Sequence, residues 1–492
     1  MTKTTYLATN IPYRLDSFPC PCRRQLPVRD GTGQTLQNYV PSLAGMLGSE
    51  SSAGEDDVNG WQNLSLEQDL LLQVFEKLSS SQLVKLSSVS SGWRRTITTL
   101  CDLWQRLDIS PVQAKSASFA AWVEARGQSV RQLSIVPLGD WGLPQSCDRQ
   151  FLASMGHLQV FIDGTRISME SLQQIQPSLQ EIQAVCEVDS SVVDADGCGT
   201  LNLSHLTGLR KLELCIDTQP PANMRNVEVQ LAQEACVEML KLVSMSDMAI
   251  LSLCPGRFQH LRSLYISVII SQKQMEDIMV IATLMELTIG VDTSDEQLLR
   301  EPADGHDNVN ISHIGNLVNL RQLDLRLLSC YLRNGHLLQR LPELQQLSFS
   351  MTDQVAVLFR PEDGSGYELP CMLNKLQHVQ LSMHSVFDVT DCLEGLKLIT
   401  TIRSLHVILQ QSSSRGPSEV HWAIKEGSVL ARAVSLQHLQ VECTSMLIKL
   451  LPPQLRSLHV TARKVNVQVN LRVALSMLDA CHLQAKHGVE YF

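Results

Sequence analysis

The chain has 492 residues, a formal net charge of −10 and a pI near 5.8. This charge argues against non-specific binding to nucleic acid or anionic membranes, because proteins that bind in that way present a basic surface. Aromatic residues make up only 5% of the chain while leucine is abundant, which favours a stack of aliphatic layers over an aromatic-rich sandwich. The fourteen cysteines include no CxxC pair, so we expect free thiols in a reducing compartment rather than a disulfide framework or a zinc site.

Residues 1–63 are rich in Pro, Gly, Ser and Thr and have few periodic apolar positions, so we expect a flexible leader. The first residues lack the apolar core of a signal peptide, and the most apolar later stretch, near 278–290, is too short to span a bilayer. We therefore expect a cytoplasmic and/or nuclear protein. The DGTGQT sequence at 30–35 lacks the Lys-Ser/Thr of a phosphate loop, and we interpret it as a turn.

The pattern of apolar residues at 64–110 predicts three short amphipathic helices. Their apolar residues are spaced by three and four, with interruptions at the serine cluster 79–81 and near 99–102. Two S-x-x-Q sequences, beginning at Ser65 and Ser79, are typical of capping boxes at helix starts. The fourteen large apolar residues at these spaced positions exceed what so small a helical unit buries by itself, so we expect a partner protein to cover part of them.

The spacing of these residues follows a family pattern. A leucine run leads to Val74-Phe75, then to Trp93-Arg94-Arg95, and Leu103-Trp104 follow ten and eleven residues after Trp93. The stretch resembles an F-box, the module that binds a Skp-family adaptor in a cullin-based ubiquitin ligase. It departs from the family at Glu67 (usually Pro), Gln82 (usually Asp) and Ser90 (usually Cys). The resemblance implies an adaptor-binding set of Leu66, Leu70, Leu71, Val74, Phe75, Leu83, Val89 and Trp93. The alternative is a small helical domain whose aromatic residues only fill a core.

A different pattern follows. The signature apolar-x-x-apolar-x-apolar recurs thirteen times between residues 130 and 455, every 27 residues on average (325 residues over twelve intervals). This period falls in the leucine-rich-repeat range, so we predict one short strand per signature and a return segment between strands. One weak copy is placed at Leu240-Val243-Met245. The ninth repeat position lacks the usual Asn or Cys, so we expect an irregular ladder; its residues are Asp217, Asp292, Thr352, His384, Gln410, Thr444 and Arg463.

These patterns together predict an α/β repeat protein, in which a three-helix F-box precedes an irregular leucine-rich-repeat solenoid. The expected ranges are a leader at 1–63, the F-box at 64–110, the solenoid at 115–463 and a C-terminal cap or tail at 464–492.

The sequence has no HExxH, no G-x-S-x-G and no P-loop, and Asp194-x-Asp196-Gly197 meets His205 where a calcium loop needs Glu. We therefore expect a non-catalytic protein without metal or cofactor. The fifth positions of the strands are expected on the concave face, either as a target-binding surface or as an ordinary solvated one. The candidates for target binding are Glu213, Tyr265, Asp324, Gln380, His406, Gln440 and His459.

Six signatures have Arg directly after their first apolar residue. We expect the stems of these side chains to cover neighbouring leucines, although a basic ladder for an acidic ligand is the alternative. These arginines are Arg131, Arg210, Arg262, Arg321, Arg403 and Arg456.

The resemblance implies a substrate-recruiting subunit of an SCF-type E3 ubiquitin ligase. Its partners would be a Skp-family adaptor, a cullin and an unknown target protein, with no nucleic acid and no membrane. The alternative is a leucine-rich-repeat interaction scaffold with a vestigial F-box.

Overall fold

The computed structural model divides into two compact units, residues 1–51 and 52–492, and every residue described below belongs to the second. Apart from a few positions inside them, the described ranges are 73–136, 150–188, 198–218, 226–244, 258–267, 272–290, 308–333, 335–351, 373–409 and 421–491.

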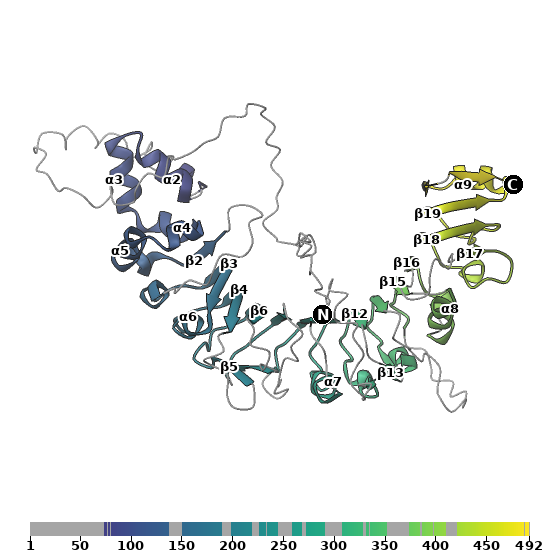
Figure 1. Ribbon diagram of the computed structural model, residues 1–492, viewed down its shortest axis with the longest axis horizontal. Helices are drawn as coiled ribbons and strands as arrows, with labels where there is room; N and C mark the ends of the chain where they lie inside the picture. Colours follow the sequence, from purple (N-terminus) through teal and green to yellow (C-terminus); the bar gives the residue numbers. More distant parts are fainter. Residues whose placement is uncertain are drawn as a thin grey trace, which may run out of the picture. The chain divides into compact units, whose positions relative to one another are not determined.

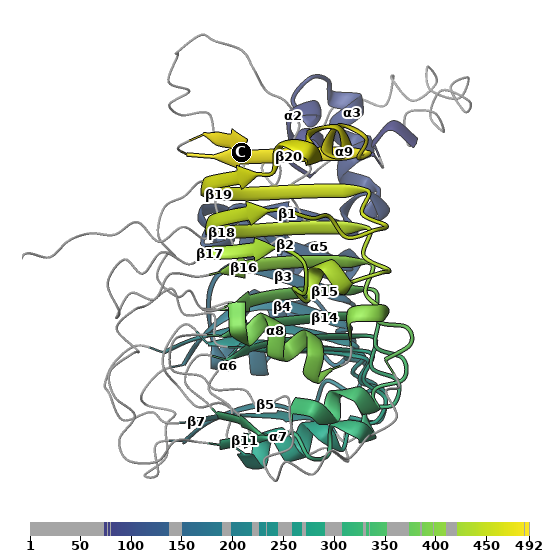
Figure 2. The same ribbon diagram turned by 90° about the vertical axis from the view of Figure 1, so that its right-hand side faces the viewer.

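The second unit is built on one 17-stranded sheet, all of whose pairings are parallel (Figures 1 and 2). Fifteen strands follow one another in chain order, so each repeat adds one strand next to the previous one. Their bounds are β1 Arg106–Ile109, β2 Gln132–Ile135, β3 Val160–Ser168, β4 Glu181–Val188, β6 Lys211–Thr218, β8 Met239–Ser244, β9 Ser263–Ser267, β10 Glu286–Gly290, β12 Gln322–Leu327, β14 Gln346–Met351, β15 His378–Met383, β16 Ser404–Leu409, β18 His438–Ile448, β19 Ser457–Val467 and β20 Ala480–Ala485.

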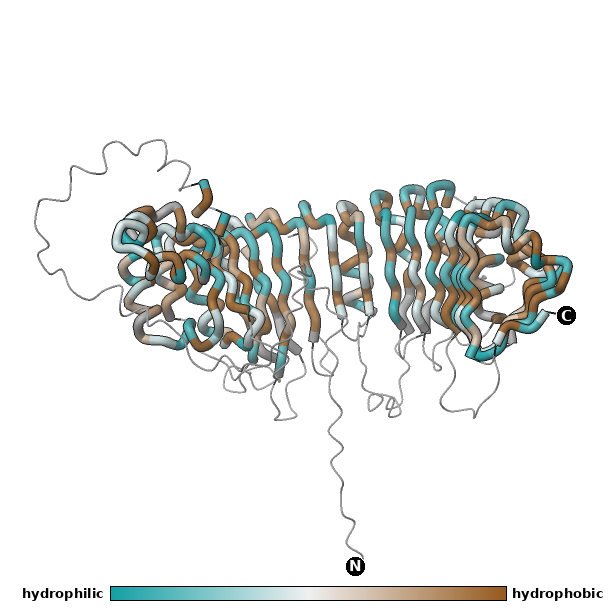
Figure 3. The backbone as a smooth tube through the Cα atoms, turned by 90° about the horizontal axis from the view of Figure 1, so that it is seen from above, coloured by the Kyte–Doolittle hydropathy of each residue, from teal (hydrophilic) through white to brown (hydrophobic). Residues whose placement is uncertain are grey.

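The signature explains this stacking. Successive side chains of a strand point to opposite faces, so the second and third apolar residues of each signature enter the interior while the third and fifth positions face outward. Leu212, Leu240 and Leu264 lie side by side on β6, β8 and β9, and all three are buried. Hydrophobic and hydrophilic residues alternate along these strands in Figure 3. Burying one such leucine side chain stabilises the fold by about 1.5–3 kcal/mol.

The weak signature at Leu240-Val243-Met245 was predicted in the wrong register. Leu240 pairs with Leu212 and Leu264, which hold the second apolar position of their repeats. The repeat therefore begins at Val237, which is buried, and the outward-facing fifth position is Lys241.

Short helices and small parallel strand pairs form the return segments. The helices α6, α7 and α8 lie on the outer, convex side of the curved sheet (Figure 1). Two separate parallel pairs, β5–β7 and β11–β13, lie within these segments. The elements are α6 Met169–Gln173, α7 Gln272–Met279, α8 Val386–Gly395, β5 Cys198–Leu203, β7 Asn226–Leu231, β11 Asn308–Asn310, β13 Tyr331–Arg333 and the 3-10 turns η5 Gln150–Ser154, η9 Ile314–Asn316, η10 Gly335–Arg340, η11 Leu398–Thr400 and η12 Leu430–Arg432.

Polar side chains tie consecutive return segments together. Thr283 Oγ1 donates to the carbonyl of Leu261 at 2.8 Å, Asn319 Nδ2 to Ala282 at 3.0 Å and Ser435 Oγ to Thr400 at 2.7 Å. These residues lie just before the strands rather than at the ninth position. These side chains therefore satisfy backbone carbonyls of the preceding return segment at the start of the strands.

Helices lie at the N-terminal end of the sheet. Residues 73–75 are helical, and α2 (Ser80–Ser87), α3 (Ser91–Thr99) and η3 (Cys101–Trp104) lead into β1, with α2 in contact with β1. After β1 come α4 (Pro111–Ala114), α5 (Ala117–Arg126) and η4 (Gly127–Ser129). The strand β1 thus lies inside residues 64–110 and pairs directly with β2.

Residues 464–492 contain the end of β19, η13 (Val469–Leu471), α9 (Arg472–Ser476), β20 and β21 (Val489–Tyr491). The long strands β18 and β19 each pair with three partners. In addition to its two neighbours in the chain-order ladder, β18 pairs with β17 (His421–Ile424) at its end, and β19 pairs with β21 at its end.

Candidate functional site

The residues expected to bind an adaptor divide into a buried and an exposed group. Phe75 and Leu83 are each only 1% exposed, whereas Val74 and Val89 are 53% and 66% exposed. Trp93 is half-buried, and its ring meets that of Phe75 edge to face, with centroids 5.9 Å apart. Phe75 and Leu83 therefore support the helices, and the two valines are the ones that face outward. The other three expected residues, Leu66, Leu70 and Leu71, lie outside the described residues.

The local chemistry fixes the orientation of α3 and η3. Ser90 is the N-cap of α3, and its side chain accepts a hydrogen bond from the amide of Trp93 at 3.0 Å. This serine, one of the departures from the F-box pattern, therefore stabilises the helix start. The Trp104 indole donates to the carbonyl of Ile97 at 2.8 Å, and the Arg94 guanidinium donates to that of Ser87 at 3.1 Å. The two predicted capping boxes begin at Ser65 and Ser79, which lie outside the described residues.

The second surface is a row of fifth-position residues on the exposed face of the sheet, here called the fifth-position row. The strand register aligns Glu213, Lys241, Tyr265, Thr288, Asp324, Ser348, Gln380, His406, Gln440, His459 and His482 across neighbouring strands. All seven target-binding candidates lie in this row. Whether they bind a target remains a prediction.

Lys241 is the member of the row that the sequence interpretation missed, because the register of that repeat was misassigned. Its ammonium lies 3.7 Å from a Glu213 carboxylate oxygen and 5.3 Å from the Tyr265 ring centroid. Lys211 adds ion pairs of 2.7 Å to Glu181 and 2.9 Å to Glu213. Burial by itself lowers the pKa of Lys211, but its hydrogen bonds to Glu181 and Glu213 outweigh that effect and raise the pKa above its usual value.

A hollow of about 850 Å³ lies along the middle of this row, over β8 to β16. Its walls carry Lys241, Tyr265, Asp324 and His406, and the remaining polar lining includes five serines, one threonine and three glutamines. Arg326 also lines the hollow, and its guanidinium lies 3.0 Å from the Asp324 carboxylate. A Cβ atom on Gly290 would come within 2.6 Å of the Cβ atom of Arg326, so any other residue at 290 would displace this arginine.

Three of the last five residues of the row, toward its C-terminal end, are histidines. The rings of His459 and His482 stack with centroids 4.6 Å apart. His406 contacts a Glu442 carboxylate oxygen at 3.3 Å, and Gln440 donates to that same oxygen at 3.3 Å.

We also searched the described parts of the chain for metal-binding groups and reactive thiols. Within those ranges no group of three or more His, Cys, Asp or Glu side chains is placed to hold a metal ion. Burial raises the pKa of the Cys186, Cys215 and Cys443 thiols to about 12, so these sulfurs are poor nucleophiles. No helix of the described residues is both long and apolar enough to cross a membrane.

Comparison with known proteins gives one family match. Residues 68–110 match the F-box-like family. No curated protein matches the chain.

The similar solved structures are leucine-rich-repeat proteins of low identity. A leucine-rich-repeat protein of Leptospira interrogans is 12% identical, with a TM-score of 0.40, over 77% of this chain and 90% of that one. An internalin of Listeria monocytogenes is 13% identical, with a TM-score of 0.35, over 73% of this chain and 88% of that one. The fold assignment therefore rests on the strand register itself. Residues 68–110 thus form an F-box-like domain, and the strands that follow form a parallel sheet with the register of leucine-rich repeats.

Proposed function

We propose that this protein is the substrate-recruiting subunit of an SCF-type E3 ubiquitin ligase. In this proposal the F-box binds a Skp-family adaptor, and through it a cullin, while the repeats hold a target protein. The coarser statement, that the chain is a protein-interaction adaptor, follows from its two modules.

The observation that carries the proposal is the exposure of two apolar side chains at the positions implied by the F-box pattern. Val74 is 53% exposed and Val89 is 66% exposed, although Phe75 and Leu83 beside them are buried. An apolar group that the fold leaves in water at such positions supports docking of a partner that covers it.

The proposed mechanism involves no bond chemistry on this chain. A target held on the repeats and a ubiquitin-charged enzyme held through the cullin become parts of one assembly. The transfer between them then depends on a high effective concentration, set by the geometry of the assembly. The fifth-position row and its hollow of about 850 Å³ are the proposed target surface.

The test is titration of a purified Skp-family adaptor into the wild-type protein and the Val74→Asp, Val89→Asp double variant. Because both valines are exposed, the variant should fold normally. Its affinity for the adaptor should fall at least about 100-fold, because binding would remove the two introduced carboxylates from water. Val473→Asp is the matched control, since Val473 is 69% exposed at the opposite end of the sheet.

Equal binding of the double variant and the wild type would contradict the assignment of Val74 and Val89 to the interface. If the wild-type protein itself does not bind the adaptor, the scaffold with a vestigial F-box becomes the better interpretation. Glu67, in place of the usual proline, is the feature of the sequence that favours that second function.

A further inference from the structure

The residue directly before each strand belongs to a second row, which runs beside the exposed face. We name it the Arg/Gln row: Gln105, Arg131, Gln159, Gln180, Arg210, Glu238, Arg262, Met285, Arg321, Gln345, Gln377, Arg403, Gln437, Arg456 and Asp479. Twelve of the fifteen residues are Arg or Gln, and none is Lys.

Backbone hydrogen bonds hold this row in line. From Gln105 to Gln437, the carbonyl of each row residue accepts from the amides of the next row residue and of the residue after it. For example, Arg262 O accepts from Met285 N at 2.7 Å and from Glu286 N at 2.9 Å, and Met285 O accepts from Arg321 N at 2.7 Å. The side chains of the row are therefore presented at regular intervals along the edge of the sheet.

The row is basic in a chain whose formal net charge is −10. It carries six arginines against two carboxylates, and no guanidinium of the six forms an ion pair with a carboxylate of the described residues. If these side chains only covered neighbouring leucines with their aliphatic parts, lysine would serve equally well at these positions. The exclusive use of Arg favours recognition of planar anions, because a guanidinium fork matches a carboxylate and an ammonium does not.

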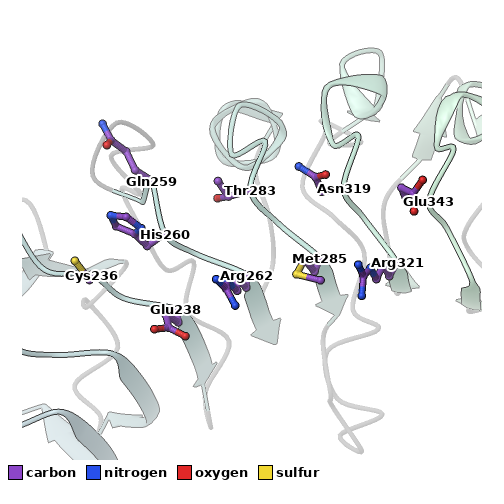
Figure 4. A pocket seen from close by; sticks show the side chains of 10 residues that line it. All are labelled: Cys236, Glu238, Gln259, His260, Arg262, Thr283, Met285, Asn319, Arg321 and Glu343. Atoms are coloured by element: carbon purple, nitrogen blue, oxygen red, sulfur yellow. The ribbon is translucent and has the colours of Figure 1, made fainter.

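A hollow of about 560 Å³ lies at the centre of the row (Figure 4). Arg262 and Arg321 lie on either side of Met285 in its wall, with His260 nearby. Glu343, at one end, is paired with Lys375 at 2.6 Å, so Glu238 is the carboxylate that remains to repel an anion there.

We infer that the Arg/Gln row is a docking surface for an acidic segment of a partner protein, seated at the Arg262–Arg321 hollow. These arginines precede β9 and β12, which are separated by β10, so their backbones lie about 10 Å apart. A segment in the polyproline II conformation advances about 3.1 Å per residue and has three residues per turn. Two acidic residues three positions apart on such a segment lie on the same face about 9 Å apart, which matches this spacing.

This inference rests on the proposed role of the repeats as the part that holds a partner, but it is independent of adaptor docking. The probe is a fluorescein-labelled twelve-residue peptide with Glu at every third position and Leu and Ser between, and its Gln-for-Glu counterpart is the neutral control. Fluorescence anisotropy with the full chain should show binding of the Glu peptide that weakens as salt is added. The Gln peptide should not bind.

Variants that remove a positive or a negative charge from the row should change peptide binding in opposite directions. Arg262→Gln with Arg321→Gln should weaken binding about tenfold, and Glu238→Gln should tighten it about twofold, as expected for exposed charge pairs. Arg126→Gln with Arg472→Gln removes the same charge outside the row and should leave binding unchanged.

Two results would overturn the inference: no binding of the Glu peptide to the wild-type chain, or equal losses in the row variant and the off-row variant. The Val74→Asp, Val89→Asp variant should bind the peptide as the wild type does. A failure of adaptor docking would therefore be distinguishable from a failure of this surface.

Discussion

The two ends of the repeat sheet are covered in different ways. At the N-terminal end, α2 contacts β1, and the side chains of Trp104, Leu107 and Ile109 are buried. At the C-terminal end, β20 has a largely exposed face, Leu483 is only half-buried, and Met477 of the preceding turn is 80% exposed. Solenoids need a cap at each terminus because the last layer has no neighbour.

This difference indicates that the F-box helices serve two purposes at once. They cover the first layer of the repeat sheet, and they keep Val74 and Val89 exposed. The proposed docking residues and the capping residues belong to one helical unit, so a substitution of its buried residues is expected to damage the repeats as well as the proposed docking surface.

The largest expected effect is at the covered end. Trp104→Ala removes a buried indole and leaves the Ile97 carbonyl without its 2.8 Å hydrogen bond. We expect the free energy of unfolding, measured in urea, to fall by about 3–5 kcal/mol. Trp104→Phe keeps most of the ring and should lose less. A loss below about 1 kcal/mol for Trp104→Ala would show that the helices contribute little to the sheet.

The thiols give a second way to compare the middle of the sheet with its C-terminal end. Cys186 is buried on β4, where burial first, and then the charge of Glu187, raises its pKa to about 12. A raised pKa means less reactive thiolate at pH 8. Burial also raises the pKa of Cys481 on β20, but the side chain of Cys481 is exposed and that of Cys186 is not. Iodoacetamide should label Cys481 more than about 100-fold faster than Cys186.

The readout is the mass of each cysteine-containing peptide after timed labelling of the native protein. The same peptides labelled in urea provide the control, since unfolding should make the two rates similar. Equal rates in the native protein would mean that the layer around β4 opens as readily as the end of the sheet.

A matched pair of leucines measures the same contrast in energy. Leu214 on β6 and Leu483 on β20 both hold the third apolar position of their signatures, but only Leu214 is fully buried. Leu214→Ala should cost about 2–5 kcal/mol and Leu483→Ala about 1 kcal/mol, as judged by urea unfolding. Similar costs for the two would indicate that the last layer is packed as tightly as the middle.

The regular part of this fold could be predicted from the sequence. The side-chain period of two fixes which residues of each signature are buried, so the central strands follow directly from their leucines. The errors occurred where a second pattern fitted equally well. Val243 also fits the apolar pattern, so the register of its repeat was misassigned and Lys241 was not placed in the fifth-position row. Residues 104–109 fit the spacing of the F-box and also that of the first strand.

The exposed surfaces were harder to predict for a physical reason. Val74 and Phe75 are adjacent and both apolar, and only the packing of the helices decides that one is buried and the other exposed. The Arg/Gln row was visible in part as six arginines, but its alignment depends on the backbone ladder that joins the repeats.

The smallest expected effect is at the most exposed apolar residue of the C-terminal end. Met477 is 80% exposed, so Met477→Ser removes almost no buried area, and the melting temperature should change by less than about 1 °C. Differential scanning calorimetry at two protein concentrations gives the readout, with Met275→Ser, at a fully buried position of α7, as the destabilising control. A fall of several degrees in Met477→Ser that grows with protein concentration would mean that a second copy covers this end in solution. The contrast between the two ends would then hold for the single chain but not for the assembled protein.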